Sequence, residues 1–199
     1  MRVLEAHLRL IVAITGASGS IYGIRLLEKL RRNGDVEVHL VMSRSGEQTL
    51  HLETGRTPED VRRLAHHSHA IDDMASRLAS GSFPASGMVV APCSVRTLSS
   101  IACGISSNLL LRAADVTLKE RRRLVLMVRE TPLHLGHIRA MAAVTEMGAI
   151  VAPPLPAFYN RPESVMDIVD SSVDRVLDLL GLPSPDARRW NPAATEASR

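Results

Sequence analysis

Aromatic residues are scarce in this sequence, at 3% of 199 residues. Proteins that bind single-stranded nucleic acid stack the bases on aromatic side chains and follow the backbone with a positive groove. The formal net charge is only +3, and most basic residues are interleaved with acids, as in "LLEKLRRNGD". The sequence therefore predicts no nucleic-acid partner.

Cysteines and long apolar runs are also scarce. Cys93 and Cys103 are the only two cysteines, too few for a disulfide framework or a paired zinc site. No uninterrupted apolar run approaches the roughly 18 residues of a membrane span, and Glu5 and His7 interrupt what would be the apolar part of a signal peptide. We therefore expect no membrane span and a cytoplasmic protein.

Metal ligands and a nucleophilic cysteine are not indicated either. Two groups of histidines are candidate metal ligands. One group is His66, His67 and His69, and the other is His134 and His137. No neighbouring cysteine or acid completes a tetrahedral set around them, so the sequence predicts no metal site. Cys93 has no identifiable histidine partner and suits a buried position in its turn.

Apolar segments alternate with helix-like segments along the chain. Five runs have strand character, at Arg9–Thr15, Val36–Met42, Gly87–Ser94, Arg123–Glu130 and Ala149–Pro154. Each strand is followed by a loop and then a helix, which predicts an α/β fold with a doubly wound, Rossmann-like parallel sheet in three αβα layers. Few strand signals occur from Ser45 to Ser80, although Thr57-Pro58-Glu59 is typical of a helix start.

One domain is expected for residues 1–182, because a chain of this length can bury a single core. Residues 183–199 are rich in proline, alanine and serine. We expect this tail to be partly disordered, or to cover the active site with Trp190 as its anchor.

Ligands of doubly wound sheets bind outside the carboxyl ends of the strands. The loops expected to meet there are 16–20, 43–45, 92–97, 130–132 and 154–159. The first of them, in "VAITGASGSIY", has free amides, the Ser18 hydroxyl and a helix dipole, which suit a phosphate monoester.

A dinucleotide is a poorer fit to this loop. Gly16, Gly19 and Gly23 do not have the G-x-G-x-x-G spacing, and Ser43-Arg44 replaces the acid expected after the second strand. No lysine follows Tyr22 or Tyr159 at the distance used by short-chain dehydrogenases, and no G-K-[ST] follows the loop as in a P-loop.

Three long motifs resemble a known family. "AITGASGSIYG", "APCSVRTLSSIACGISSNLLLRAADVTLKERRRLVLMVRE" and "PAFYNRP" are similar to the UbiX/Pad-type flavin prenyltransferases of the homo-oligomeric flavin-containing Cys decarboxylase superfamily. The resemblance runs from about Arg9 to Leu182. It implies a flavodoxin-like fold and an oligomer, a dodecamer in that superfamily.

The resemblance also implies a metal-independent transferase. Reduced FMN would be prenylated by dimethylallyl monophosphate, first at N5 with loss of phosphate and then at C6, to give prenyl-FMN. A UbiD-type decarboxylase, in ubiquinone synthesis or hydroxyarylic acid decarboxylation, would receive this product. "TPLHLGHIRAM" is similar to members that serve either pathway.

The matching motifs assign residues to three tasks. FMN would be bound by Gly16, Ala17, Ser18, Ser43, Ser94, Val95, Arg96, Thr97 and Arg129. Dimethylallyl phosphate would be bound by Arg112, Lys119, Tyr159 and Arg175. Glu130, and Glu53 with Ser18, would transfer protons, although a solvated helix acid is the plainer interpretation of Glu53.

Two other functions stay open at this point. The chain could be an FMN-binding, non-catalytic subunit of a decarboxylase. It could also be a flavin-dependent cysteine decarboxylase. However, this sequence has "APCSVRT" at the turn where those enzymes have a sequence similar to "APASANT". It also has "PPLPAFYNRP" in place of their asparagine-bearing segment.

Overall fold

A computed structural model describes residues 8–185, 187 and 189. The chain divides into two compact units, Met1–Pro153 and Pro154–Arg199. The predicted single domain over residues 1–182 stays a prediction, and Trp190 lies outside the described residues.

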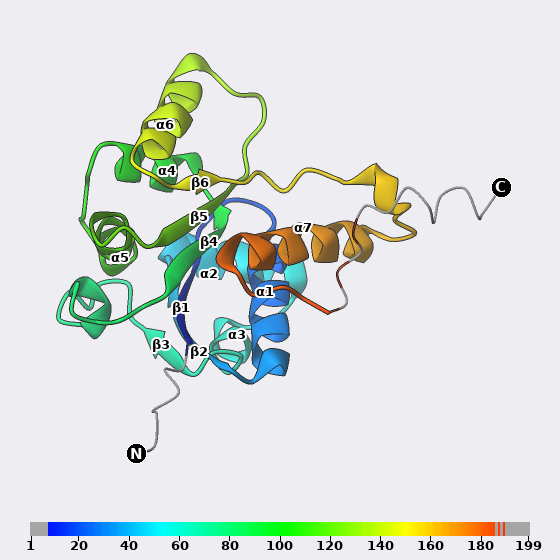
Figure 1. Cartoon of the computed structure of the whole chain (residues 1–199), viewed down its shortest axis with the longest axis horizontal. Coiled ribbons are helices and arrows are strands. Elements are labelled where there is room, and N and C mark those ends of the chain that lie inside the picture. The colour runs from blue at the N-terminus through cyan, green and yellow to red at the C-terminus, as the bar shows by residue number, and fades with distance from the viewer. Residues whose placement is uncertain (1–7, 186, 188, 190–199) are drawn as a thin grey trace. The chain divides into compact units, whose positions relative to one another are not determined.

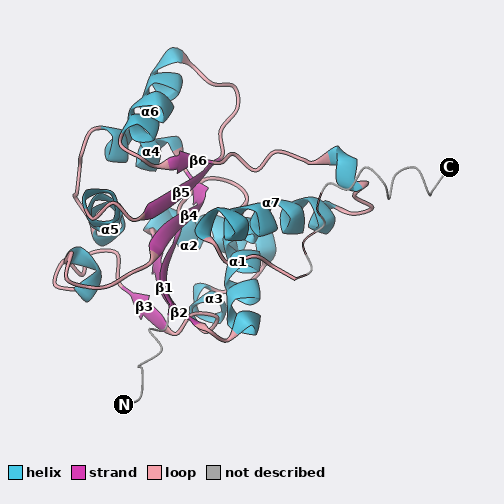
Figure 2. Cartoon of the chain, viewed as in Figure 1, coloured by secondary structure: helices cyan, strands magenta, loops and turns pink. Residues whose placement is uncertain are grey.

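The first unit is built on one six-stranded parallel sheet (Figures 1 and 2). Its spatial order is β3-β2-β1-β4-β5-β6. The strands are β1 (Leu8–Ile14), β2 (Val36–Met42), β3 (His67–His69), β4 (Gly87–Cys93), β5 (Arg123–Val128) and β6 (Ile150–Val151). The predicted doubly wound sheet is therefore confirmed, in the strand order of a Rossmann fold.

Helices cover both faces of this sheet. The segments are α1 (Ser20–Asn33), α2 (Arg44–Thr54), α3 (Pro58–Arg62), the 3₁₀ turn η1 (Arg77–Ala79), α4 (Val95–Ala102), α5 (Leu109–Lys119) and α6 (Leu135–Glu146). Figure 1 shows α1 on one face and α4, α5 and α6 on the other. Within this unit the predicted three-layer αβα arrangement is confirmed.

The second unit contains a 3₁₀ turn, η2 (Phe158–Asn160), and one long helix, α7 (Val165–Leu180). Ser164 begins α7 with a capping box, in which its hydroxyl accepts from the Asp167 amide and the Asp167 carboxylate accepts in return. Gly181, in the left-handed conformation, ends it. The predicted final helix is confirmed and begins after Ser164.

Local signals place most element boundaries correctly. The second strand has the predicted bounds, Val36–Met42. As predicted, Gly34 ends α1 in the left-handed conformation, and α3 begins after Thr57, which forms a capping box. Two expectations were wrong. β3 was not predicted, because three residues at a sheet edge carry too little apolar pattern, and β6 is much shorter than Ala149–Pro154.

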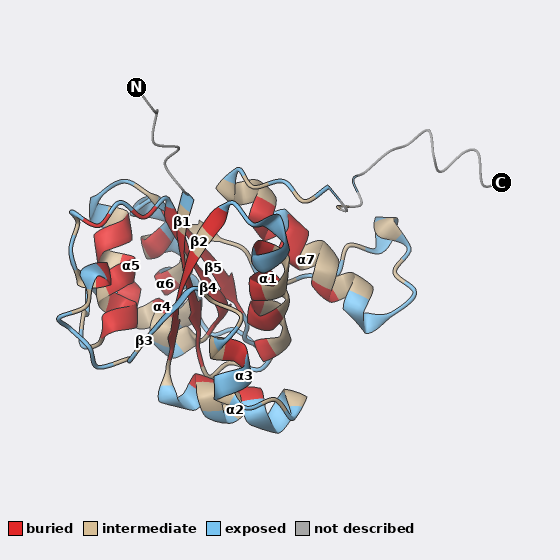
Figure 3. Ribbon diagram, turned by 90° about the horizontal axis from the view of Figure 1, so that it is seen from below, coloured by how far each residue is buried: buried red, intermediate tan, exposed pale blue. Residues whose placement is uncertain are grey.

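The core lies between the sheet and its helices. All seven residues of β4 are buried, as expected for a central parallel strand covered on both faces. Figure 3 shows the buried residues along the strands and on the inner sides of α1 and α5. Among the described residues, no helix is both long and apolar enough to cross a membrane.

Gly23 lets α1 approach the sheet closely. A Cβ atom at this position would lie 2.3 Å from the Ala91 carbonyl oxygen of β4 and 2.9 Å from the Ile14 side chain. Backbone cannot give way as a flexible side chain can. This contact therefore determines how near the first helix lies to β1 and β4.

We expect Gly23→Ala to lower the melting temperature by roughly 4–8 °C, the equivalent of an overpacking cost of about 2 kcal/mol. Calorimetry measures this directly. Gly136→Ala in α6 is the matched control, because its Cβ would meet only the exposed His134 ring. Equal melting temperatures for the two variants would contradict the packing argument.

Candidate functional site

Four loops follow strands at the carboxyl edge of the sheet, where β2, β1, β4 and β5 lie side by side. A buried threonine, Thr15, joins the two central strand ends. Its hydroxyl donates to the Pro92 carbonyl oxygen (2.7 Å) and accepts from the Ser94 amide (2.9 Å). The order of strands reverses between β1 and β4, so this edge has the topology of a ligand-binding crevice.

Three helices begin at this edge. Gly19 precedes α1 with φ of 103°, a left-handed conformation that favours glycine. Ser43 caps α2 by accepting from the Gly46 amide, and Ser94 caps α4 by accepting from the Thr97 amide. Amides at helix N-termini attract anions, so the edge is suited to a phosphate or another negative group.

Glu53 supplies one anion from the protein itself. Its carboxylate accepts from the amides of Gly19 (3.0 Å) and Ser20 (3.0 Å) at the start of α1. Burial alone would raise the pKa of Glu53, but the Ser18 hydroxyl and the two amides stabilise the anion and lower this pKa overall. Glu53 is therefore a tethered carboxylate on an exposed residue of α2.

The loop amides predicted to hold a phosphate are thus partly occupied. Those of Gly19 and Ser20 are bonded to Glu53. Gly16 lies against α2, since a Cβ at Gly16 would be 2.6 Å from the Ser45 Cβ. The segment from Gly16 to Ser18 remains as the part of the loop that can approach a ligand closely.

Arg129 and Glu130 follow β5 and are both exposed. The Arg129 amide donates to the Cys93 carbonyl oxygen (3.1 Å), which holds this segment beside the end of β4. Tyr22 of α1 was not predicted as a site residue. Burial raises its pKa and the charge of Arg129 opposes that shift, so Tyr22 and Arg129 lie near each other at this edge.

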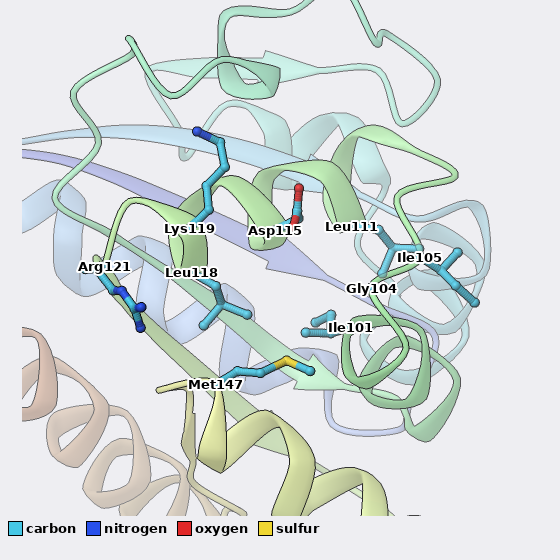
Figure 4. Close-up of a pocket in the computed structure, with 9 residues that line it drawn as sticks. All are labelled: Ile101, Gly104, Ile105, Leu111, Asp115, Leu118, Lys119, Arg121 and Met147. Atoms are coloured by element: carbon cyan, nitrogen blue, oxygen red, sulfur yellow. The ribbon is translucent and has the colours of Figure 1, made fainter.

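Arg112 and Lys119 lie on one face of α5, as their spacing of seven predicted. Arg112 donates to the Ala79 carbonyl oxygen (3.1 Å) and pairs with Asp115. Lys119 pairs with Glu120 and borders an apolar cavity of about 530 Å³. Figure 4 shows Lys119 and Asp115 on one side of α5, and Leu118 on the side of Met147.

Lys119 and Glu130 lie near opposite ends of β5. Lys119 ends α5 four residues before β5 begins, and Glu130 comes two residues after β5 ends. The six residues of β5 span about 17 Å at roughly 3.3 Å per residue. One copy of this unit therefore does not bring Lys119 to the loop that carries Glu130.

Tyr159 and Arg175 belong to the second unit. Tyr159 is exposed in η2, and Arg175 is on the exposed side of α7. Cys93, in contrast, is fully buried in the first unit, and burial raises its pKa to about 12. Its thiol is protonated at neutral pH, which agrees with the packing role predicted for it.

Comparisons with known proteins identify the family. A family model described as Flavoprotein matches residues 3–177. The flavin prenyltransferase UbiX of Escherichia coli is 53% identical over 187 residues, which cover 93% of this chain and 99% of that protein. The Thauera aromatica protein of the same name is 54% identical over 92% of this chain and 94% of its own length. The chain belongs to the UbiX family of flavin prenyltransferases.

Solved structures of UbiX proteins have the same fold. One, crystallised with FMN and dimethylallyl pyrophosphate, has a TM-score of 0.91 and 51% identity over 93% of this chain and 98% of its own. A dodecameric FMN-dependent UbiX-like decarboxylase from Escherichia coli also has a TM-score of 0.91, with 50% identity over 92% and 100% of the two chains. The predicted family resemblance is thereby confirmed.

Removing the charge of Glu53 should destabilise the protein in a pH-dependent way. A carboxylate bonded to a helix N-terminus contributes about 1 kcal/mol. Since folding lowers the pKa of Glu53, this contribution is complete above the ordinary glutamate pKa of about 4.3 and is lost as the pH falls through the lowered pKa of the folded protein. Glu53→Gln should therefore unfold more easily than wild type at pH 7, and the difference should shrink as the pH falls below about 4.

Denaturant titrations at several pH values measure this difference. Glu146→Gln, at an exposed acid in the last turn of α6, is the control and should follow wild type throughout. A Glu53→Gln variant as stable as wild type at pH 7 would show that the tether contributes nothing.

Proposed function

We propose that this chain is a flavin prenyltransferase, which joins a dimethylallyl group to N5 and C6 of reduced FMN with dimethylallyl monophosphate as the donor. The observation that carries the proposal is the identity of 53% with a relative of that name over 93% of the chain. That span includes the loops at the carboxyl edge of the sheet. The reaction belongs to the transferases.

FMN suits this edge of the sheet in two respects. Two helix N-termini there, those of α2 and α4, are not bonded to Glu53, and their dipoles favour the negative charges of a phosphate and of a reduced flavin. Gly16 has no room for a side chain because it packs against Ser45, which holds the loop close to the start of α2. When bound, FMN supplies the electron-rich ring atoms that are prenylated.

The FMN-binding residues we propose come from all four loops. They are Gly16, Ala17, Ser18, Ser43, Ser94, Val95, Arg96, Thr97 and Arg129. Ser43 and Ser94 orient helix N-termini through their caps. The exposed Arg96 and Arg129 side chains supply the positive charge.

Loss of phosphate from an allylic carbon concentrates negative charge on the leaving oxygen. Fixed cationic and hydroxyl donors stabilise that charge. We assign this task to Arg112, Lys119, Tyr159 and Arg175. Asp115 and Glu120, which pair with Arg112 and Lys119, would have to yield part of their contact to the phosphate.

Two copies of the chain build one site in this proposal. Lys119 and Glu130 are separated by the length of β5, so the Lys119 that serves a given Glu130 comes from a neighbouring copy. A homo-oligomer is therefore part of the mechanism, in keeping with the dodecameric structure of a relative.

Proton transfer is assigned to carboxylates on both sides of the crevice. Glu53 is ionised, because its pKa is lowered, and it lies beside Ser18, so the pair can accept a proton when the C6 bond forms. Glu130 is exposed at the end of β5 and can exchange a proton with N5 or with the departing phosphate. The product, prenyl-FMN, would serve a UbiD-type decarboxylase.

Anaerobic incubation with reduced FMN and dimethylallyl monophosphate should convert the flavin to a species heavier by one prenyl group, detected by mass spectrometry. Glu130→Gln should slow this conversion by about 100-fold or more, the usual contribution of a general acid or base. Glu146→Gln is the control. Unmodified flavin with the wild-type chain would favour a non-catalytic FMN-binding subunit instead.

Mixed oligomers test whether two copies share each site. Lys119→Ala and Glu130→Gln chains should each be inactive alone. Co-assembled in equal amounts, they should regain about a quarter of the wild-type activity, because half of the lysines and half of the glutamates are intact. If both residues served the same copy's site, every site would carry one lesion and the mixture would stay inactive.

A further inference from the structure

A cluster of titratable side chains lies at the other end of β2, where this strand pairs with the edge strand β3. The parallel register sets His39 opposite His67, and Glu37 shares their side of the sheet because it is two residues before His39. Glu37 Oε1 lies 3.2 Å from His39 Nε2 and 3.1 Å from His67 Nε2. We call these three residues the β2–β3 cluster.

We propose that the β2–β3 cluster binds a divalent transition metal of the Zn²⁺ class, with water as its fourth ligand. Tetrahedral ligands at about 2.0–2.1 Å from Zn²⁺ lie about 3.3 Å from each other. The two measured contacts to Glu37 are close to this value. All three ligand atoms lie within 4.8 Å of one another. The His39 and His67 rings are stacked, with centroids 4.7 Å apart, so the exposed His67 ring has to turn out of the stack for both nitrogens to face one ion.

The residues around the cluster orient its ligands. The other ring nitrogen of His39, Nδ1, is 3.0 Å from His69 Nε2, and His69 Nδ1 is 2.9 Å from the Ser76 hydroxyl. In the tautomer in which His39 Nδ1 donates to His69, the Nε2 nitrogen of His39 is free to bind an ion. Arg9 donates to the other oxygen of Glu37, Oε2 (2.8 Å). Histidines and carboxylates that bind metals usually have such partners.

The three residues of the cluster differ in exposure. His39 is fully buried and Phe83 packs edge-on against its ring, whereas the side chain of His67 is 48% exposed. The exposed side leaves a position open for water.

This site is separate from the proposed flavin site. His39 precedes Ser43, the residue after β2 at the flavin edge, by four residues, or about 13 Å of extended chain. A metal here would join the short edge strand to β2. We therefore expect it to affect stability and to leave prenyl transfer unchanged.

The sequence alone does not indicate the metal site of the β2–β3 cluster. His66, His67 and His69 have no acid near them in the sequence. Glu37 and His39 are about thirty residues earlier, and only the pairing of β2 with β3 brings them to His67.

Zinc titration of the untagged, chelator-treated protein tests the proposal. Calorimetry should show one saturable site per chain, and Co²⁺ in its place should give the visible spectrum of a four-coordinate ion. Zn²⁺ at a hundred times its Kd should raise the melting temperature by roughly 5–10 °C. His67→Ala should weaken binding by about 100-fold or more, and His69→Ala by roughly 10- to 100-fold.

Glu37→Gln keeps the shape of the cluster and provides a second ligand variant if His67→Ala does not fold. His134→Ala is the control for surface histidines, because His134 and His137 also lie together, with ring centroids 3.6 Å apart. Binding that is lost in the cluster variants and kept in His134→Ala supports the site. No saturable binding, or binding that persists without His67 and Glu37, overturns it.

Discussion

The candidate site depends on the hydroxyl of Thr15, which fixes the carboxyl ends of the two central strands to each other. It bridges the ends of β1 and β4 by bonding to Pro92 and Ser94, where the strand order reverses. This buried hydroxyl both donates and accepts a hydrogen bond. Displacing it would leave buried polar groups unpaired, which lowers the free energy of unfolding. The glycine loop after β1 and the α4 cap after β4 therefore keep a constant separation.

Glu53 adds a negative charge to an edge that otherwise attracts anions. It takes the amides that start α1, so a flavin phosphate cannot also use them. The loop thereby divides into two parts, a stretch from Gly16 to Ser18 that we propose binds the flavin and a stretch bonded to Glu53. Ser18 lies at their junction, where its hydroxyl bonds to a carboxylate of lowered pKa.

The two ends of the strands serve different tasks. The carboxyl ends carry the candidate flavin site, whereas Lys119 lies before the amino end of β5, and the β2–β3 cluster lies in the first half of β2 and at the start of β3. A parallel sheet separates these surfaces by the length of its strands, about 17 Å along β5. The proposed metal site is therefore separate from the flavin loops, whereas a neighbouring copy takes part in the proposed flavin site.

Local chemistry in the sequence determined the elements and the family. Apolar runs, the Asn33-Gly34 stop and the Thr57 cap predict strands and helices because they act within a few residues. Long motifs then carried the resemblance and the list of site residues. Two features were decided only by tertiary structure: the tether between Glu53 and Gly19, and the meeting of His39 with His67. Each joins residues far apart in the sequence through strand pairing or helix packing, and such long-range contacts leave no local pattern in a single sequence.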